Sequence, residues 1–245
     1  MLLAIAHGVL IKSDLDKRYS MEVYVVGDSI SIQYGPYLET ALHRVMDYAR
    51  KEGEEVALRN LDMPQGANGG DSSMVLAFLE AKAVAGGIDA DLLLLNCGLH
   101  DIKTDPATGA KQVPIGQYAQ NLEWIVQSVR NMGLILIWIR TTPCDETIHN
   151  HASMAFHRFA ADCQTYNAVA DRIMRDHEVP IIDLYTFTQN LRLLPSERAT
   201  QNQPDDLYCD HVHFHDHIRR QQAAFIAGWL AGFAQTSWAI SKSPL

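Results

Sequence analysis

A serine in a glycine-containing turn is the first residue of this sequence that could do chemistry. Ser29 ends the triplet Gly27-Asp28-Ser29, directly after the apolar residues 23–26. Where a strand of a parallel sheet passes into a helix, a serine hydroxyl is exposed beside backbone N–H groups that can stabilise an oxyanion. Ser29 is therefore a candidate nucleophile for acyl transfer. The triplet alone does not establish this role, because all three residue types favour turns, and we expect Asp28 to be a helix N-cap.

An aspartate and a histidine three residues apart could supply the orienting acid and the base that a serine nucleophile needs. Asp210 and His213 lie in the segment DHVHFHDH, residues 210–217, just before the last expected helix. At this spacing on a turn, both side chains point the same way. The Asp210 carboxylate can then accept a hydrogen bond from one imidazole nitrogen of His213 while the other nitrogen faces the serine.

The alternate histidines of the same segment leave a metal-dependent hydrolase open as an alternative. On an extended strand they would all face one side and could bind zinc. These histidines are His211, His213, His215 and His217. Against this alternative, the segment precedes a helix, and the sequence shows no other cluster of histidine or carboxylate ligands. Two further histidines, His149 and His151, lie in a polar loop and are interpreted as solvent-exposed.

Strands and helices alternate along the sequence and would position these residues. The apolar segments 92–95 and 134–139 lack polar alternation, which is typical of strands buried on both faces. The expected strands are 22–26, 55–58, 92–95, 134–139 and 179–183. The expected helices are 36–49, 71 or 72 to 85, 118–129, 156–173 and 218–233, with mostly loop over 187–210. This pattern predicts an α/β fold, a three-layer α/β/α arrangement with a five-stranded parallel sheet, flavodoxin-like in type.

Polar residues follow three of the expected strands, where ligands bind in such a sheet. They are residues 28–29, 68–71 and 98–101. Because the carboxyl ends of parallel strands lie at one edge of the sheet, we expect these three segments to converge beside the serine.

Taken together, these residues resemble the SGNH (GDSL-type) hydrolase superfamily of esterases, lipases and carbohydrate deacetylases, over about residues 22–233. The resemblance implies that Ser29 is the nucleophile, that His213 is the base and that Asp210 orients it. It also implies that the backbone N–H groups of Ser29 and Gly70 donate to the oxyanion. Gly70 lies in the segment NGGDS, which looks like the second block of the family.

The third block departs from the family pattern at one position. The family usually has Gly-x-Asn-Asp, whereas this chain has Gly98-Leu99-His100-Asp101. His100 stands where the oxyanion-binding asparagine is expected. An imidazole can also donate a hydrogen bond to the oxyanion, so we interpret His100 as the third oxyanion donor.

Composition limits the partners and the compartment. The net charge of -9 argues against nucleic-acid or anionic-membrane surfaces, and no apolar run approaches the ~20 residues that span a bilayer. Four widely separated cysteines are typical of reduced thiols, which favours a cytoplasmic location. Residues 1–20 are interpreted as an N-terminal extension and residues 21–245 as a single hydrolase domain. The sequence does not indicate an oligomeric state.

The predicted function is hydrolysis of a small-molecule ester by two-step acyl transfer, without a metal or organic cofactor. Polar loops near the site and the acidic composition favour a small acyl group such as acetyl, for example on a carbohydrate. A catalytically inactive module that binds a glycan or small ligand is a further alternative. The presence of Ser29, Asp210 and His213 argues against it.

Overall fold

All five strands of the central sheet run parallel, as the sequence predicts. The computed structural model describes residues 21–151, 154–192 and 207–241. The strand order is β2-β1-β3-β4-β5, the flavodoxin-like order, which confirms the predicted fold class. The strands are β1 (Glu22–Val26), β2 (Asp47–Arg50), β3 (Leu92–Leu95), β4 (Ile135–Ile139) and β5 (Ile181–Ile182). The predicted extension, residues 1–20, lies outside the described residues.

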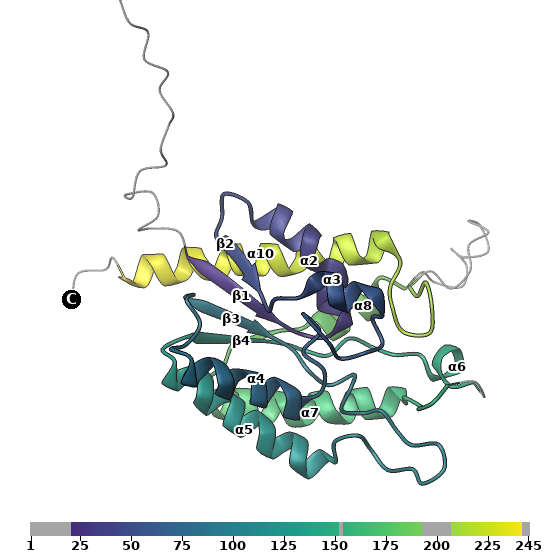
Figure 1. Ribbon diagram of the computed structural model, residues 1–245. Helices are drawn as coiled ribbons and strands as arrows, with labels where there is room; N and C mark the ends of the chain where they lie inside the picture. The colour runs from purple at the N-terminus through teal and green to yellow at the C-terminus, as the bar shows by residue number, and fades with distance from the viewer. Residues whose placement is uncertain (1–20, 152–153, 193–206, 242–245) are drawn as a thin grey trace, which may run out of the picture.

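Helices cover both faces of the sheet and complete the three layers (Figure 1). On one face α10 packs against α2 and α8, and on the other α5 packs between α4 and α7. The helices are α2 (Ser29–Leu42), α3 (Glu54–Arg59), α4 (Ser72–Val84), α5 (Ile115–Asn131), α6 (Glu146–His149), α7 (Ala160–Asp176), α8 (Leu184–Asn190) and α10 (Asp216–Ser241). Within the described part of the chain, no helix is both long and apolar enough to cross a membrane.

The central strands are apolar along their whole length because both of their faces are covered. β3 consists of four leucines, and none of them is exposed to solvent. Continuous apolar strands are expected where helices pack on both sides of a parallel sheet. In the register of β1 with β3, Val26 pairs with Leu95. The polar residues that follow these two strands are therefore neighbours at the carboxyl edge.

The second strand lies earlier in the chain than predicted. Residues 55–58 belong to helix α3, and the strand is Asp47–Arg50, which the sequence pattern assigned to the end of a helix. Helix α2 ends at Leu42, and Arg44 then adopts a left-handed φ of 72° that turns the chain back toward β1. β2 lies at the edge of the sheet and has a polar sequence, so it can be recognised as a strand from its pairing with β1 but not from its hydrophobic pattern.

Three helices also differ from their predicted positions. α2 begins at Ser29, so Pro36 lies inside it rather than at its start. α7 begins at Ala160, four residues after the predicted start at 156. α8 occupies part of the segment predicted as loop, because the Asp183 side chain caps it by accepting from the Thr186 N–H at 3.0 Å. Of the rest of that predicted loop, residues 193–206 lie outside the described residues.

Candidate active site

Ser29 is the first residue of helix α2, directly beyond the end of β1. The Asp28 carboxylate caps this helix by accepting from the Ile30 N–H at 3.0 Å, which confirms the predicted cap. The Asp28 N–H donates in turn to Asn96 Oδ1 at 3.3 Å, beyond the end of β3. A Cβ atom on Gly27 would lie 2.7 Å from that oxygen, so this close approach requires glycine. The turn therefore holds the Ser29 hydroxyl at the carboxyl edge of the sheet.

Ser29, His213 and Asp210 form a continuous hydrogen-bonded array. His213 Nε2 lies 2.9 Å from Ser29 Oγ, and His213 Nδ1 lies 2.7 Å from Asp210 Oδ2. With Nδ1–H donating to the carboxylate, Nε2 presents a lone pair that can take the serine proton. The structure thus brings together the three residues that the sequence singled out, although 184 positions separate Ser29 from His213.

The Asp210 carboxylate is fixed by its own turn. Its Oδ1 accepts from the backbone N–H of Val212 at 2.9 Å and of His213 at 2.7 Å. Burial acts to raise the pKa of Asp210, but the hydrogen bonds from His213 and from these backbone groups prevail and hold the pKa below its ordinary value. Asp210 is therefore a carboxylate, and it favours the tautomer of His213 that has its proton on Nδ1.

Gly70 lies in a segment that runs beside the end of β1. Asn68 forms an isolated parallel bridge with Gly27, and the Gly69 N–H donates to the Gly27 carbonyl at 2.8 Å. Gly70 has a φ of +73°, and its N–H donates to Asn68 Oδ1 at 3.0 Å. The segment is thus close to the serine turn as predicted. The Gly70 N–H has an internal acceptor, so its oxyanion role stays a prediction.

His100 is buried in the turn that follows β3, with 3% of its surface exposed. Burial, followed by the positive charges of Lys103 and Arg158, lowers the pKa of His100 well below its ordinary value. The imidazole is therefore neutral at physiological pH, with one ring nitrogen as donor and the other as acceptor. The role of His100 as an oxyanion donor stays a prediction.

Arg158 is a buried cation near this site that the sequence analysis did not identify. Its Nε donates to the Leu99 carbonyl at 2.7 Å, next to His100, and only 3% of Arg158 is exposed. The guanidinium lies over the Phe156 ring, 4.9 Å from its centre, and its Nη1 is buried without a partner among the described residues. No local pattern marks an arginine in an irregular segment as buried, so the sequence offered no signal for it.

A second histidine–aspartate pair lies beside the first. His211 Nε2 is 3.1 Å from Asp62 Oδ1, and His211 Nδ1 is 2.9 Å from His149 Nδ1. The rings of His211 and His213 meet edge to face, 5.9 Å apart. The interpretation of His149 as solvent-exposed is wrong, because its side chain is fully buried against His211 and Phe156.

The four alternate histidines do not gather around one point. In the described part of the chain, the group that could hold a metal ion comprises Asp62, His211 and His213. His215 and His217 stack on each other outside this group. The extended strand that the zinc alternative requires is not formed, since α10 begins at Asp216.

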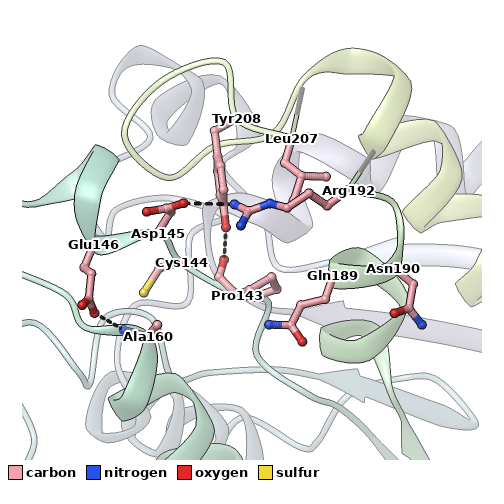
Figure 2. Close-up of a pocket in the computed structure, with 10 residues that line it drawn as sticks. All are labelled: Pro143, Cys144, Asp145, Glu146, Ala160, Gln189, Asn190, Arg192, Leu207 and Tyr208. Carbon is pink, nitrogen blue, oxygen red and sulfur yellow. Dashed lines mark hydrogen bonds and ion pairs between the residues drawn. The ribbon is translucent and has the colours of Figure 1, made fainter. Parts of the chain in front are cut away.

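A cavity of about 560 Å³ lies beside the loop that leads to Asp210 (Figure 2). Its wall is mostly polar, with Asp145 paired to Arg192 at 3.0 Å and with Glu146 nearby. The Tyr208 hydroxyl, also in the wall, donates to the Pro143 carbonyl at 2.9 Å. Neither Ser29 nor His213 lines this cavity. The cavity therefore lies next to the loop that leads to Asp210 and is not the pocket that contains the nucleophile.

The overall structure is similar to solved hydrolases at low sequence identity. A lipase/acylhydrolase from Enterococcus faecalis matches with a TM-score of 0.61 and 16% identity, over 86% of this chain and 96% of that one. The acetylxylan esterase Axe2 from Geobacillus stearothermophilus matches with a TM-score of 0.58 and 16% identity, over 86% and 93%. A GDSL-like lipase from Bacteroides thetaiotaomicron matches with a TM-score of 0.60 and 12% identity, over 90% of each chain. These likenesses establish the fold.

The sequence itself matches a family model. No curated protein matches the chain. Residues 25–218, however, match the model of the GDSL-like Lipase/Acylhydrolase family, a span that runs from β1 through the aspartate–histidine turn to the start of α10. Since this span is well over half of the chain and includes every segment at the carboxyl edge described above, the protein belongs to the GDSL-like lipase/acylhydrolase family.

Proposed function

We propose that this protein is a serine esterase that hydrolyses carboxylic esters by two-step acyl transfer. The observation that carries the proposal is the hydrogen-bonded array of Ser29, His213 and Asp210. Nucleophile, base and orienting acid lie within hydrogen-bond distance in the order that acyl transfer requires. Membership of a lipase/acylhydrolase family supports the same class of reaction.

In the first step, Ser29 Oγ attacks the ester carbonyl carbon while His213 Nε2 takes the hydroxyl proton. The alcohol then leaves with that proton, and the acyl group remains on Ser29. In the second step, His213 takes a proton from water while the oxygen of that water attacks the acyl carbonyl carbon. The bond from that carbon to Ser29 Oγ then breaks, His213 returns the proton to Ser29 Oγ, and the carboxylic acid leaves. Asp210 holds His213 by its Nδ1–H and stabilises the imidazolium in both steps. These steps use side chains and water alone.

Three donors are proposed for the oxyanion: the backbone N–H groups of Ser29 and Gly70, and the imidazole of His100. The Ser29 N–H is at the start of α2, where the helix's own hydrogen bonds do not use it. The Gly70 N–H must exchange Asn68 Oδ1 for the substrate oxygen. Because His100 is neutral, it donates through one N–H without adding a charge that would oppose the imidazolium of His213.

The proposed substrate is an ester of a small acyl group, acetyl in the first instance, on a soluble and polar alcohol such as a carbohydrate. The acidic composition and the polar sequence of the loops near the site support a polar alcohol part. Among the solved structures that share the fold, Axe2 and a second protein named AlAXEase are acetylxylan esterases. At 15–16% identity these neighbours suggest a substrate class to test first.

The test is hydrolysis of p-nitrophenyl esters of increasing acyl length by the wild type and by Ser29→Ala. We expect the acetyl ester to be the best substrate, and Ser29→Ala to lose on the order of 10⁶-fold in kcat. Ser29→Ala that hydrolyses the acetyl ester at the wild-type rate would overturn the nucleophile assignment. A rate that increases with acyl length would overturn the assignment of a small acyl group.

A second experiment separates an esterase from a binding module. A serine-directed organophosphorus reagent should label the wild type once, at Ser29, and should not label Ser29→Ala. A module without a nucleophile would not react in either form. Acetate release from an acetylated oligosaccharide, with the deacetylated oligosaccharide as a control, then tests the carbohydrate part of the proposal.

A further inference from the structure

His211 and His213 each have a polar partner at Nδ1, and this contact orients each ring. His211 Nδ1 lies 2.9 Å from His149 Nδ1, and His213 Nδ1 lies 2.7 Å from Asp210 Oδ2. The other ring nitrogen of His211, Nε2, lies 3.1 Å from Asp62 Oδ1. Histidines that bind metal ions in proteins are oriented by a hydrogen bond at the other ring nitrogen, commonly to a carboxylate, as at His213 Nδ1.

We infer that Asp62, His211 and His213 form a binding site for a divalent transition-metal ion, Zn²⁺ in the first instance, and that the bound ion inhibits the enzyme. One ligand atom from each of the three side chains lies within 4.8 Å of the others. Tetrahedral zinc, with bonds of about 2.0–2.2 Å, needs its ligand atoms roughly 3.4 Å apart. Modest side-chain rotations would close this difference.

The donor set selects the kind of ion. Two imidazoles and one carboxylate are ligands that zinc and its neighbours among the transition metals prefer, and they leave a fourth position for water. Mg²⁺ and Ca²⁺ prefer oxygen ligands and should not compete. The Arg158 cation interacts with Asp62 and opposes a positive ion there. We therefore expect reversible binding rather than a permanently bound ion.

Inhibition follows from the atom that the ion would occupy, and this part of the inference rests on the proposed function. His213 Nδ1 donates to Asp210, so Nε2 is the nitrogen available to a metal ion. The same Nε2 lies 2.9 Å from Ser29 Oγ and must take the serine proton. A metal ion on Nε2 occupies the lone pair that the proton needs, and the nucleophile is no longer activated.

The first test measures hydrolysis of p-nitrophenyl acetate by the full chain against ZnCl₂ and MgCl₂. We expect Zn²⁺ to inhibit the wild type, EDTA to restore the rate, and Mg²⁺ to have no effect. Asp62→Asn and His211→Gln should hydrolyse the ester in zinc-free buffer but need at least about 10-fold more Zn²⁺ for half-inhibition, since loss of a ligand should cost no less than loss of a ligand's hydrogen-bond partner. The matched control is His217→Gln, an exposed histidine outside the group, which should keep the wild-type sensitivity.

The second test measures zinc binding by equilibrium dialysis and does not depend on activity. His211→Gln and Asp62→Asn should bind one Zn²⁺ fewer per chain than the wild type and His217→Gln at the same free concentration. Equal binding and equal inhibition in all four proteins would overturn the site. A protein that binds zinc as described but hydrolyses no ester would keep the metal site and overturn only the proposed function.

Discussion

Asp101 Oδ1 accepts a hydrogen bond of 2.9 Å from the backbone N–H of Ser72, and this bond joins two segments of the candidate site. Asp101 follows His100 in the turn after β3, whereas Ser72 is the first residue of α4, two positions after Gly70. The bond therefore joins the loop that carries His100, one proposed oxyanion donor, to helix α4, which follows Gly70, another proposed donor. Asp101 thus supplements the N-cap residue of α4, Asp71, whose side chain accepts from the Met74 N–H.

The first prediction is a pH-dependent effect of Asp101→Asn on stability. Burial raises the pKa of Asp101 from 3.8 to about 7. Between these values the folded protein binds more protons than the unfolded chain, so this group's contribution to stability falls as the pH rises through 7. Asparagine keeps the acceptor for the Ser72 N–H but cannot ionise. Relative to the wild type, Asp101→Asn should gain about 3 kcal/mol in unfolding free energy from pH 5 to pH 8, because the wild type loses about 1.4 kcal/mol per pH unit between pH 5 and 7.

Urea unfolding of both proteins at pH 5 and pH 8 measures this gain. Asp105→Asn is the matched control. Hydrogen bonds from the Thr108 and Ala107 N–H groups hold the pKa of the exposed Asp105 below its ordinary value. Asp105 is thus ionised at both pH values, and its variant should differ from the wild type by the same amount at each. A difference for Asp101→Asn that does not change with pH would show that its carboxyl is ionised throughout.

The second prediction concerns His100. Replacement by alanine removes one proposed oxyanion donor, which should cost about 2.7–4 kcal/mol in the barrier, or roughly 10²–10³ in kcat. His100→Asn restores an amide N–H at the position where the family usually has asparagine, and it should recover a large part of that loss. Steady-state kinetics on p-nitrophenyl acetate measures both. If alanine leaves kcat unchanged, His100 does not contact the oxyanion.

The elements that the sequence predicted correctly are those that a short pattern determines. Asp28 and Ser29 lie in one short turn, and Asp210 and His213 lie in another, so each pair can be recognised from neighbouring residues. The four consecutive leucines of β3 are enough to indicate a strand that is buried on both faces. The edge strand β2 carries the polar sequence DYAR, so only its pairing with β1 identifies it. In the same way, Asp62 lies 149 positions from His211, and no local pattern could have joined them.

The third prediction compares two glycines that share a backbone conformation. Gly70 and Gly109 both have a φ of +73°, where an L-residue is strained by about 1–3 kcal/mol. A Cβ on Gly109 would meet no atom within 4 Å, whereas a Cβ on Gly70 would lie 2.6 Å from Met74 Sδ and 2.9 Å from Pro64 Cβ. Gly70→Ala should therefore destabilise the protein more than Gly109→Ala, and it alone should lower kcat.

Thermal unfolding and ester hydrolysis of the two variants separate strain from function. Gly109→Ala measures the loss of stability that an alanine with positive φ causes in the absence of any steric clash. If both variants lose equal stability and both keep full activity, the Gly70 segment does not form part of the oxyanion site.

The last prediction assigns Arg158 a positioning role on His100. Its Nε–H holds the Leu99 carbonyl, and its charge contributes, after burial and Lys103, to keeping the pKa of His100 low. Arg158→Gln should raise the pKa of His100, lower kcat more than it changes KM, and destabilise the fold by about 1–3 kcal/mol through the unpaired carbonyl. Arg158→Lys keeps a cation and a donor, so the pKa of His100 should stay closer to its wild-type value.

An NMR titration of the His100 ring protons, assigned by their absence in His100→Asn, measures the pKa of His100 directly. If the pKa of His100 is the same in the wild type and in Arg158→Gln, the charge of Arg158 does not act on His100, and the role of Arg158 is structural only.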